Sequence, residues 1–122
     1  MKYELAKQLK DAGFPQKYGN FMTEEGCVFD IPSKNRAHLA TLDELIIAVD
    51  KLRDKRKVSD FEIKNRIYNG GAEMQWAASL AYPPEPRIIE MGNTPTEAVA
   101  HLWLSLISLV APKRIQGYIV RD

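Results

Sequence analysis

The side chains that most often carry covalent or acid–base chemistry are scarce in this sequence. It has one cysteine, Cys27, and two histidines, His38 and His101. A cysteine nucleophile needs a base or a positive charge beside its thiol, and the sequence alone does not place these three residues together. We interpret Cys27, which stands between Gly26 and Val28, as a small apolar filler, since free cysteines are usually buried.

Each histidine also has an ordinary structural explanation. His101 follows Glu97 by four residues in a helical pattern, so these two side chains are placed to form an exposed ion pair. His38 stands in NRAHLAT, just before a helix start, where a loop or capping role explains it as well as chemistry does. We therefore predict no catalytic residue and expect a protein that is not an enzyme.

Motifs for metal or phosphate binding are not visible either. The nearest carboxylate cluster, Glu24, Glu25 and Asp30, has no histidine or cysteine pair at ligand spacing, which favours a solvated acidic loop. The glycines at 70 and 71 follow Asn69 without the Gly-Lys-Ser or Gly-Lys-Thr of a phosphate-binding loop, so this segment is typical of a hairpin turn. We predict no metal site and no cofactor.

The strongest local charge feature is a basic run near the end of a predicted helix, made of Lys51, Arg53, Lys55, Arg56 and Lys57. Cations are favourable at a helix C-terminus, where the last carbonyls carry partial negative charge. The same residues could instead contact a phosphate or a partner. Three aspartates dilute the field of the run, which favours the structural interpretation and leaves the contact site as the alternative: Asp50, Asp54 and Asp60.

The composition is that of a packed soluble domain. The chain has 122 residues, 45% of them hydrophobic and 27% charged, and we expect residues 1–122 to form a single domain. A net charge of +1 gives no global attraction for polyanions or anionic membranes. A lone cysteine is typical of a reducing cytoplasm, the N-terminus lacks the apolar core of a signal peptide, and the apolar run 102–111 is too short to span a bilayer. These features predict a cytoplasmic protein without membrane contact.

Three helices are marked by their ends. The first, ELAKQLKDA, stops at Gly13, a residue suited to a left-handed C-cap, and Pro15 prevents continuation. The second begins at TLDE, from residue 41, and the third at TPTE, from residue 94, and each is a Thr-x-x-Glu capping box. The third then carries the predicted central face of the core: Ala98, Val99, Leu102, Trp103, Leu106 and Val110, widened by Leu104 and Ile107.

Strand signals lie between the second and third helices. FEIKNRIY, residues 61–68, alternates apolar and charged side chains, and residues 74–82 alternate again after the Asn-Gly-Gly turn. RIIEM, 87–91, offers a third strand; CVFDI, 27–31, and IQGYIV, 115–120, are weaker candidates in less regular segments. We predict an α+β fold with an antiparallel sheet of three or more strands packed against helices, in the core order α-β-β-β-α.

The core order is shared with double-stranded-RNA-binding domains. In that family, lysines at the start of the last helix meet phosphates across a groove of the RNA. The matching positions here read Thr94, Pro95, Thr96 and Glu97, which offer no cation. The likeness is therefore one of topology, and nucleic-acid binding stays the alternative function, through the basic run.

Three blocks of the sequence together resemble a family. ELAKQLKDAGFPQ, TLDELI and GNTPTEAVAHLWLSL, with Trp76 between the last two, resemble small uncharacterised proteins encoded by bacteriophages and prophages. The sequence departs from that pattern at Ala40, where a proline often precedes the Thr-Leu, and in an enlarged segment around the basic run. The resemblance implies phage or prophage origin and a bacterial host, and it supplies no catalytic residue.

The function that these observations favour is protein–protein interaction. Four apolar residues fall outside the clear core stripes: Ile47, Leu104, Ile107 and Tyr118. If some of them share a face, they form the kind of exposed apolar patch that usually marks an interface. We therefore expect a small non-enzymatic protein that binds a host or phage protein, or a second copy of itself.

Overall fold

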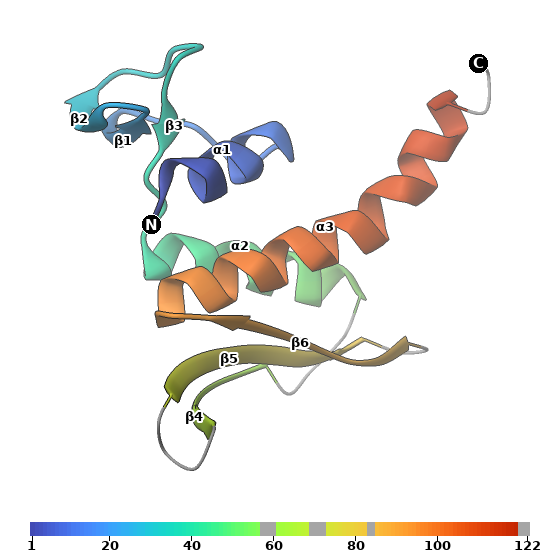
Figure 1. Cartoon of the computed structure of the whole chain (residues 1–122). Coiled ribbons are helices and arrows are strands. Elements are labelled where there is room, and N and C mark those ends of the chain that lie inside the picture. Colours follow the sequence, from blue (N-terminus) through green and yellow to red (C-terminus); the bar gives the residue numbers. More distant parts are fainter. Residues whose placement is uncertain (57–60, 69–72, 83–84, 120–122) are drawn as a thin grey trace.

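The computed structural model describes residues 1–56, 61–68, 73–82 and 85–119 (Figure 1). Within these ranges, side chains are described for residues 1–52, 61–65, 75–81 and 87–109. Among these residues, three strands stand between each helix and the next. In order they are α1 (Tyr3–Asp11), β1 (Gly19–Thr23), β2 (Gly26–Asp30), β3 (Ala37–His38), α2 (Leu42–Arg56), β4 (Glu62–Tyr68), β5 (Glu73–Tyr82), β6 (Glu85–Gly92) and α3 (Pro95–Ile119).

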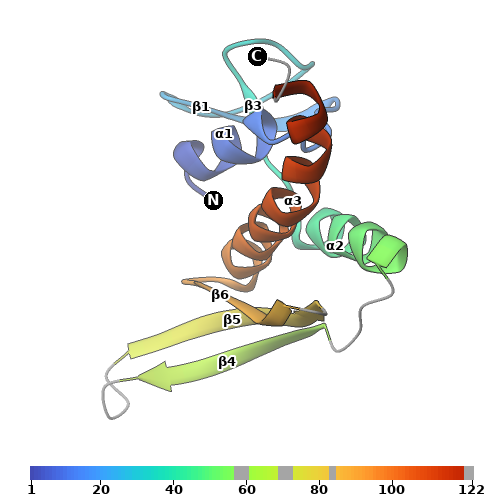
Figure 2. The ribbon, with the colours of Figure 1, turned by 90° about the vertical axis from the view of Figure 1, so that its right-hand side faces the viewer.

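The fold is α+β, as predicted, and it contains two antiparallel sheets of three strands each. The sheet of longer strands has the order β4-β5-β6, with α2 before it and α3 after it in the chain. The predicted core order is matched approximately, since α1 and a second sheet precede these elements. Because α3 packs against β5 and β6 while α2 packs against α3, both helices lie on one side of this sheet (Figures 1 and 2). The smaller sheet, β2-β1-β3, lies beside α1, and α2 and α3 lie between these elements and the larger sheet (Figures 1 and 2).

The hairpin of β4 and β5 follows the alternating pattern of the sequence. Ile63 pairs with Ala78, and both belong to the apolar core or pack on it. On the other face of β4, Glu62 Oε1 lies 3.0 Å from Arg87 Nη2 on β6. The turn predicted at residues 69–71 lies outside the described residues, but the strands on either side confirm the hairpin.

Both predicted capping boxes start their helices. At α2, Thr41 N–H donates to Glu44 Oε1 (2.9 Å) and Glu44 N–H donates to Thr41 Oγ1 (3.2 Å). At α3, Glu97 N–H donates to Thr94 Oγ1 (3.1 Å), while the Glu97 carboxylate reaches one residue further back and accepts from Asn93 N–H (3.1 Å). These bonds satisfy amides that a helix start would otherwise leave open.

The first helix ends in a Schellman motif, as the glycine and proline predict. Phe14 N–H donates to Leu9 O (2.9 Å) and Gly13 N–H donates to Lys10 O (3.0 Å), with Gly13 at φ +97°. This turn brings the Phe14 side chain into the same buried cluster as Leu9. The end of α1 is thereby fixed against the core.

The apolar body of α3 forms the centre of the core. Its five described predicted core residues are between 0% and 5% exposed: Ala98, Val99, Leu102, Trp103 and Leu106. Each such large side chain contributes roughly 1.5–3 kcal/mol on burial. Ser105, which interrupts the apolar run, donates to Glu90 Oε2 on β6 (2.6 Å), so α3 is also tied to the sheet by a polar contact.

Two parts of the sequence interpretation need correction or extension. The predicted final strand after Pro112 is wrong, because α3 continues as a helix to Ile119. This end of α3 projects away from both sheets, so no described strand lies beside it to pair with (Figure 1). The weak candidate CVFDI is confirmed as β2 (Gly26–Asp30), but its partner β1, and β3 on the other side of β1, carried no clear alternating pattern and were not predicted.

Candidate functional site

An open groove of about 450 Å³ lies where the end of α1 meets α2 and α3. Its lining is mostly apolar: Phe14, Pro15, Ile47, Ala48, Leu52, Trp103 and Ile107. Three charged side chains stand around these residues: Lys17, Glu44 and Lys51. The groove thus combines an apolar floor with a charged rim, which is the usual character of a recognition site.

The floor of the groove is buried and its lip is exposed. Phe14 and Trp103 contact each other edge to face, with ring centroids 5.2 Å apart, and both are buried. Ile47 on α2 is 55% exposed although it belongs to the groove lining. An exposed isoleucine beside a fixed aromatic floor gives a partner apolar surface to bury.

At one end of the groove, the Glu44 carboxylate contacts a lysine and a histidine. Its Oε2 atom lies 2.8 Å from Lys17 Nζ and 3.0 Å from His38 Nε2, and its Oε1 accepts from Thr41 N–H. The carboxylate that caps α2 therefore also anchors the segments before and within the small sheet.

The network changes the acidity of Glu44. Burial raises the pKa of this carboxyl group, but Lys17, the Thr41 N–H and His38 all favour the ionised form and lower the pKa from 4.5 to about 2. Glu44 is therefore ionised across the physiological range, and its charge is balanced within the chain.

His38 is buried in β3 with one ring nitrogen engaged. Nε2 contacts Glu44, the ring packs edge to face on Phe21 with centroids 5.6 Å apart, and the backbone N–H donates to Gln16 Oε1 (2.7 Å). Nδ1 is buried without a hydrogen-bond partner among the described residues. The histidine supports the start of α2, which is the loop or capping kind of role that its position suggested.

Cys27 is exposed, so its interpretation as a buried apolar filler is wrong. The reason is that α1 packs on β3 and β1, whereas β2 lies at the opposite edge of the sheet from β3. Phe21 pairs with both Val28 and His38, which puts these two on one face of the sheet and the adjacent Cys27 on the other. The geometry does not bring Cys27 and His38 together as a nucleophile and base.

His101 does not form the ion pair that its spacing suggested. The Glu97 carboxylate accepts from Asn93 N–H, and the ion pairs found among the described side chains do not include His101 with Glu97. The half-buried His101 instead lines a shallow hollow between α1 and the start of α3. Glu97 caps the start of α3, and this explains why its carboxylate does not pair with His101.

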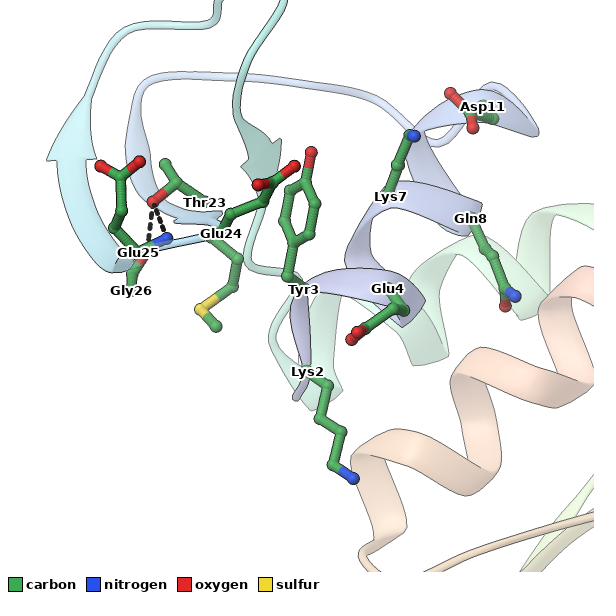
Figure 3. Close-up of a pocket in the computed structure, with 11 residues that line it drawn as sticks. Lys2, Tyr3, Glu4, Lys7, Gln8, Asp11, Thr23, Glu24, Glu25 and Gly26 are labelled. Atoms are coloured by element: carbon green, nitrogen blue, oxygen red, sulfur yellow. Dashed lines mark hydrogen bonds between the residues drawn. The ribbon is translucent and has the colours of Figure 1, made fainter.

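A larger open hollow, of about 950 Å³, lies between α1 and the β1–β2 turn (Figure 3). Its walls carry charges of both signs, among them Lys2, Lys7 and Glu25. Thr23 Oγ1 accepts from Glu25 N–H (3.1 Å) and donates to Gly26 O (3.0 Å), so this hydroxyl serves the turn. The hollow offers no arrangement that favours one kind of ligand.

The residues predicted as partner contacts are only partly described. The basic run ends α2, as the structural interpretation requires, and Lys51 is exposed at the groove. The side chains of Arg53, Lys55 and Arg56 and the whole of Lys57 lie outside the described part.

Of the four additional apolar residues, Ile47 and Ile107 line the groove, and Leu104 packs at the margin of the core. The side chain of Tyr118 is not described.

The groove itself was not foreseen, because it depends on how three elements meet. Phe14 and Glu44 each had a local explanation, as the apolar contact of a helix C-cap and as a capping carboxylate, and Lys17 carried no sequence signal. The apolar residues Ile47 and Ile107, which fall outside the clear core stripes, were the one signal that pointed to this surface. Sequence spacing cannot show that they face the same hollow.

Three observations bear on other classes of function. No group of three or more His, Cys, Asp or Glu side chains in the described part of the chain could hold a metal ion. None of the helices, as far as they are described, is both long and apolar enough to cross a bilayer. Comparison with protein families, with curated proteins and with solved structures gave no match.

Proposed function

We propose that this protein acts by binding another protein, and that the groove between the end of α1, α2 and α3 is its recognition surface. The observation that carries this proposal is an apolar groove of about 450 Å³ with the 55% exposed Ile47 at its lip. Covering an apolar side chain that is exposed to water at this groove lowers the free energy of the complex, which favours binding of a partner.

The charges around the groove indicate what kind of segment fits. Glu44 is balanced by its ion pair with Lys17, whereas Lys51 stands exposed at the rim. The rim is therefore positive on balance. An amphipathic helix with two or three large apolar side chains on one face and a carboxylate near Lys51 is the complementary partner.

The setting of this activity follows from the sequence blocks described above. Their resemblance to phage and prophage proteins supports a role in the cytoplasm of a bacterial host, where the partner is a host or phage protein. In this proposal the protein has no enzymatic step of its own.

The test uses a pair of matched surface variants. Ile47→Asp puts a charge into the groove, and Ile89→Asp makes the same change at a 44% exposed site on β6, outside the groove lining. A photo-crosslinking side chain at position 47 or 89 would first identify the partner in host cells. Binding to the purified partner would then be measured for wild type and both variants.

We expect Ile47→Asp to weaken binding at least about tenfold, because it removes apolar surface from the interface and makes the partner cover a charged group, at a cost of more than about 1.4 kcal/mol. Ile89→Asp should bind like wild type. Equal loss in both variants, or no loss in Ile47→Asp, would show that the partner does not use the groove. Thermal unfolding of both variants serves to exclude a folding defect.

A further inference from the structure

The strand β2 is an edge strand with apolar side chains in solvent. Among the described residues it pairs only with β1, and it forms the outer margin of the small sheet (Figure 1). Val28 is 39% and Phe29 63% exposed, and Cys27 is exposed beside them. Edge strands are usually protected by charges, bulges or proline, whereas β2 has a charge only at its last residue.

The pairing of β1 shows which backbone groups of β2 are open. The residue after β3 donates its N–H to Asn20 O (2.8 Å), so the backbone groups of Asn20 face β3. These groups alternate sides along a strand, and those of Phe21 therefore face β2, where Phe21 pairs with Val28. The N–H and C=O groups of Cys27 and Phe29 then point to the open edge.

The open part of the edge is short and symmetric. Toward the turn, Glu25 N–H already donates to a threonine hydroxyl of β1. Toward the other end, Ile31 N–H donates to Asp30 Oδ1 (2.8 Å), and Ile31 O accepts from Arg36 Nη1 (2.9 Å). Between these two ends, the open backbone groups are the N–H and C=O of Cys27 and the N–H and C=O of Phe29, one residue on either side of Val28.

We propose that β2 pairs antiparallel with β2 of a second copy of this chain, about a two-fold axis at Val28. In this register Cys27 of each copy lies opposite Phe29 of the other, and each of the two pairs exchanges two backbone hydrogen bonds. The same surface serves both copies, as a closed dimer requires. The two small sheets of three strands then form one continuous sheet.

The side chains are compatible with this register. The two Val28 side chains face each other across the axis, where β-branched pairs stabilise a sheet. The exposed Glu25 lies opposite Ile31 of the other copy, close to the segment that carries the exposed Lys34. The antiparallel arrangement thus separates the two acidic turns and places each near a cation, which favours a second copy as the occupant.

The strand is held in place before it pairs. Arg36 Nη1 lies 2.8 Å from Asp30 Oδ2 at the end of β2. Lys10 Nζ on α1 donates to three carbonyl oxygens of the loop that follows, those of Ser33 (2.6 Å), Lys34 (3.2 Å) and Arg36 (2.7 Å). A fixed loop lowers the ordering cost of association.

Disulfide cross-linking tests the register directly. In a Cys27→Ser background, Val28→Cys places two thiols across the axis, where paired Cα atoms are about 4.5 Å apart, within disulfide range. The matched control, Phe29→Cys in the same background, places its thiols two residues out of register, beyond about 7 Å. We expect a covalent dimer for Val28→Cys only. Equal cross-linking of the two variants, or none in either, overturns the register.

Proline substitution tests the open donor. In the register of β1 and β2, Cys27 N–H has no partner among the described residues. Cys27→Pro should therefore leave the monomer folded and weaken dimerisation at least about tenfold, while Cys27→Ala dimerises like wild type. Sedimentation equilibrium over a range of concentrations measures this. A wild-type chain that stays monomeric up to about 1 mM overturns the proposal. So does equal dimerisation of the two variants. The groove lies on other elements, so neither result bears on it.

Discussion

Phe14 and Trp103 meet edge to face, with ring centroids 5.2 Å apart and planes at 85°. The contact joins the chain just after the Schellman turn of α1 to the middle of α3. Both rings are buried in the core and both also line the groove. The floor of the groove is therefore part of the core, and its shape depends on the stability of the fold.

Removing the Phe14 ring should destabilise the protein strongly. Phe14→Ala leaves a cavity beneath Trp103 at a site that is 4% exposed, and such changes cost about 3–5 kcal/mol. Ile31→Ala, at a 59% exposed site, is the control and should change the free energy of unfolding by less than about 0.5 kcal/mol. Urea denaturation at low protein concentration measures both. Similar midpoints for the two variants would contradict the packing described here.

The carboxyl group of Glu44 should make stability depend on pH. Its pKa is lowered from 4.5 to about 2 in the folded chain, so its ionised form stabilises the fold above pH 4.5. This contribution is lost as the pH falls from 4.5 toward 2. Glu44→Gln should therefore be less stable than wild type at pH 7, by about 1–3 kcal/mol, and the difference should shrink across that acid range.

The control for this titration is Glu25→Gln, which changes an exposed carboxylate in the β1–β2 turn. Its stability should follow that of wild type between pH 7 and pH 2. Denaturant midpoints at a series of pH values give the comparison. A constant difference between wild type and Glu44→Gln across the acid range would show that the ion pairs of Glu44 do not contribute.

The sequence predicted those elements whose signals are local. A capping box needs only a threonine and a glutamate three residues apart, and both Thr41 and Thr94 start helices as expected. The Schellman turn needs only Gly13 and the apolar residue after it. Strict alternation likewise identified β4 and β5, because one face of each strand packs toward the core.

The sequence did not predict what depends on distant contacts. β1 and β3 lie in a segment broken by glycines, and β3 has two residues, too few for any periodicity. Cys27 looked like a filler because its neighbours are apolar, yet β2 is an edge strand and exposes it. The groove needs the end of α1, α2 and α3 together, and their mutual placement is not written in any one of them.

Gly92 should not tolerate a side chain. A Cβ atom at this position would lie 2.5 Å from Ala98 N and 2.9 Å from Glu97 C, backbone atoms of the first turn of α3. Gly92→Ala would have to shift the helix start, at a cost of about 1–3 kcal/mol. The comparison is Gly13→Ala, which meets no atom within 4 Å and adds only the strain of φ +97°, about 1 kcal/mol. Thermal unfolding should place Gly92→Ala below Gly13→Ala, and the reverse order would contradict the contact.

The basic run at the end of α2 provides a test between protein and nucleic-acid binding. Lys51 lies at the groove rim, so in our proposal it meets a carboxylate of a protein partner. Phosphate contacts would instead give binding to DNA or RNA that weakens steeply with salt and is reduced in Lys51→Ala. We expect fluorescence anisotropy to show no such binding at low salt, and no difference from Lys7→Ala, an exposed lysine on α1. Salt-sensitive binding that is lost in Lys51→Ala and kept in Lys7→Ala would favour the nucleic-acid function over the one proposed here.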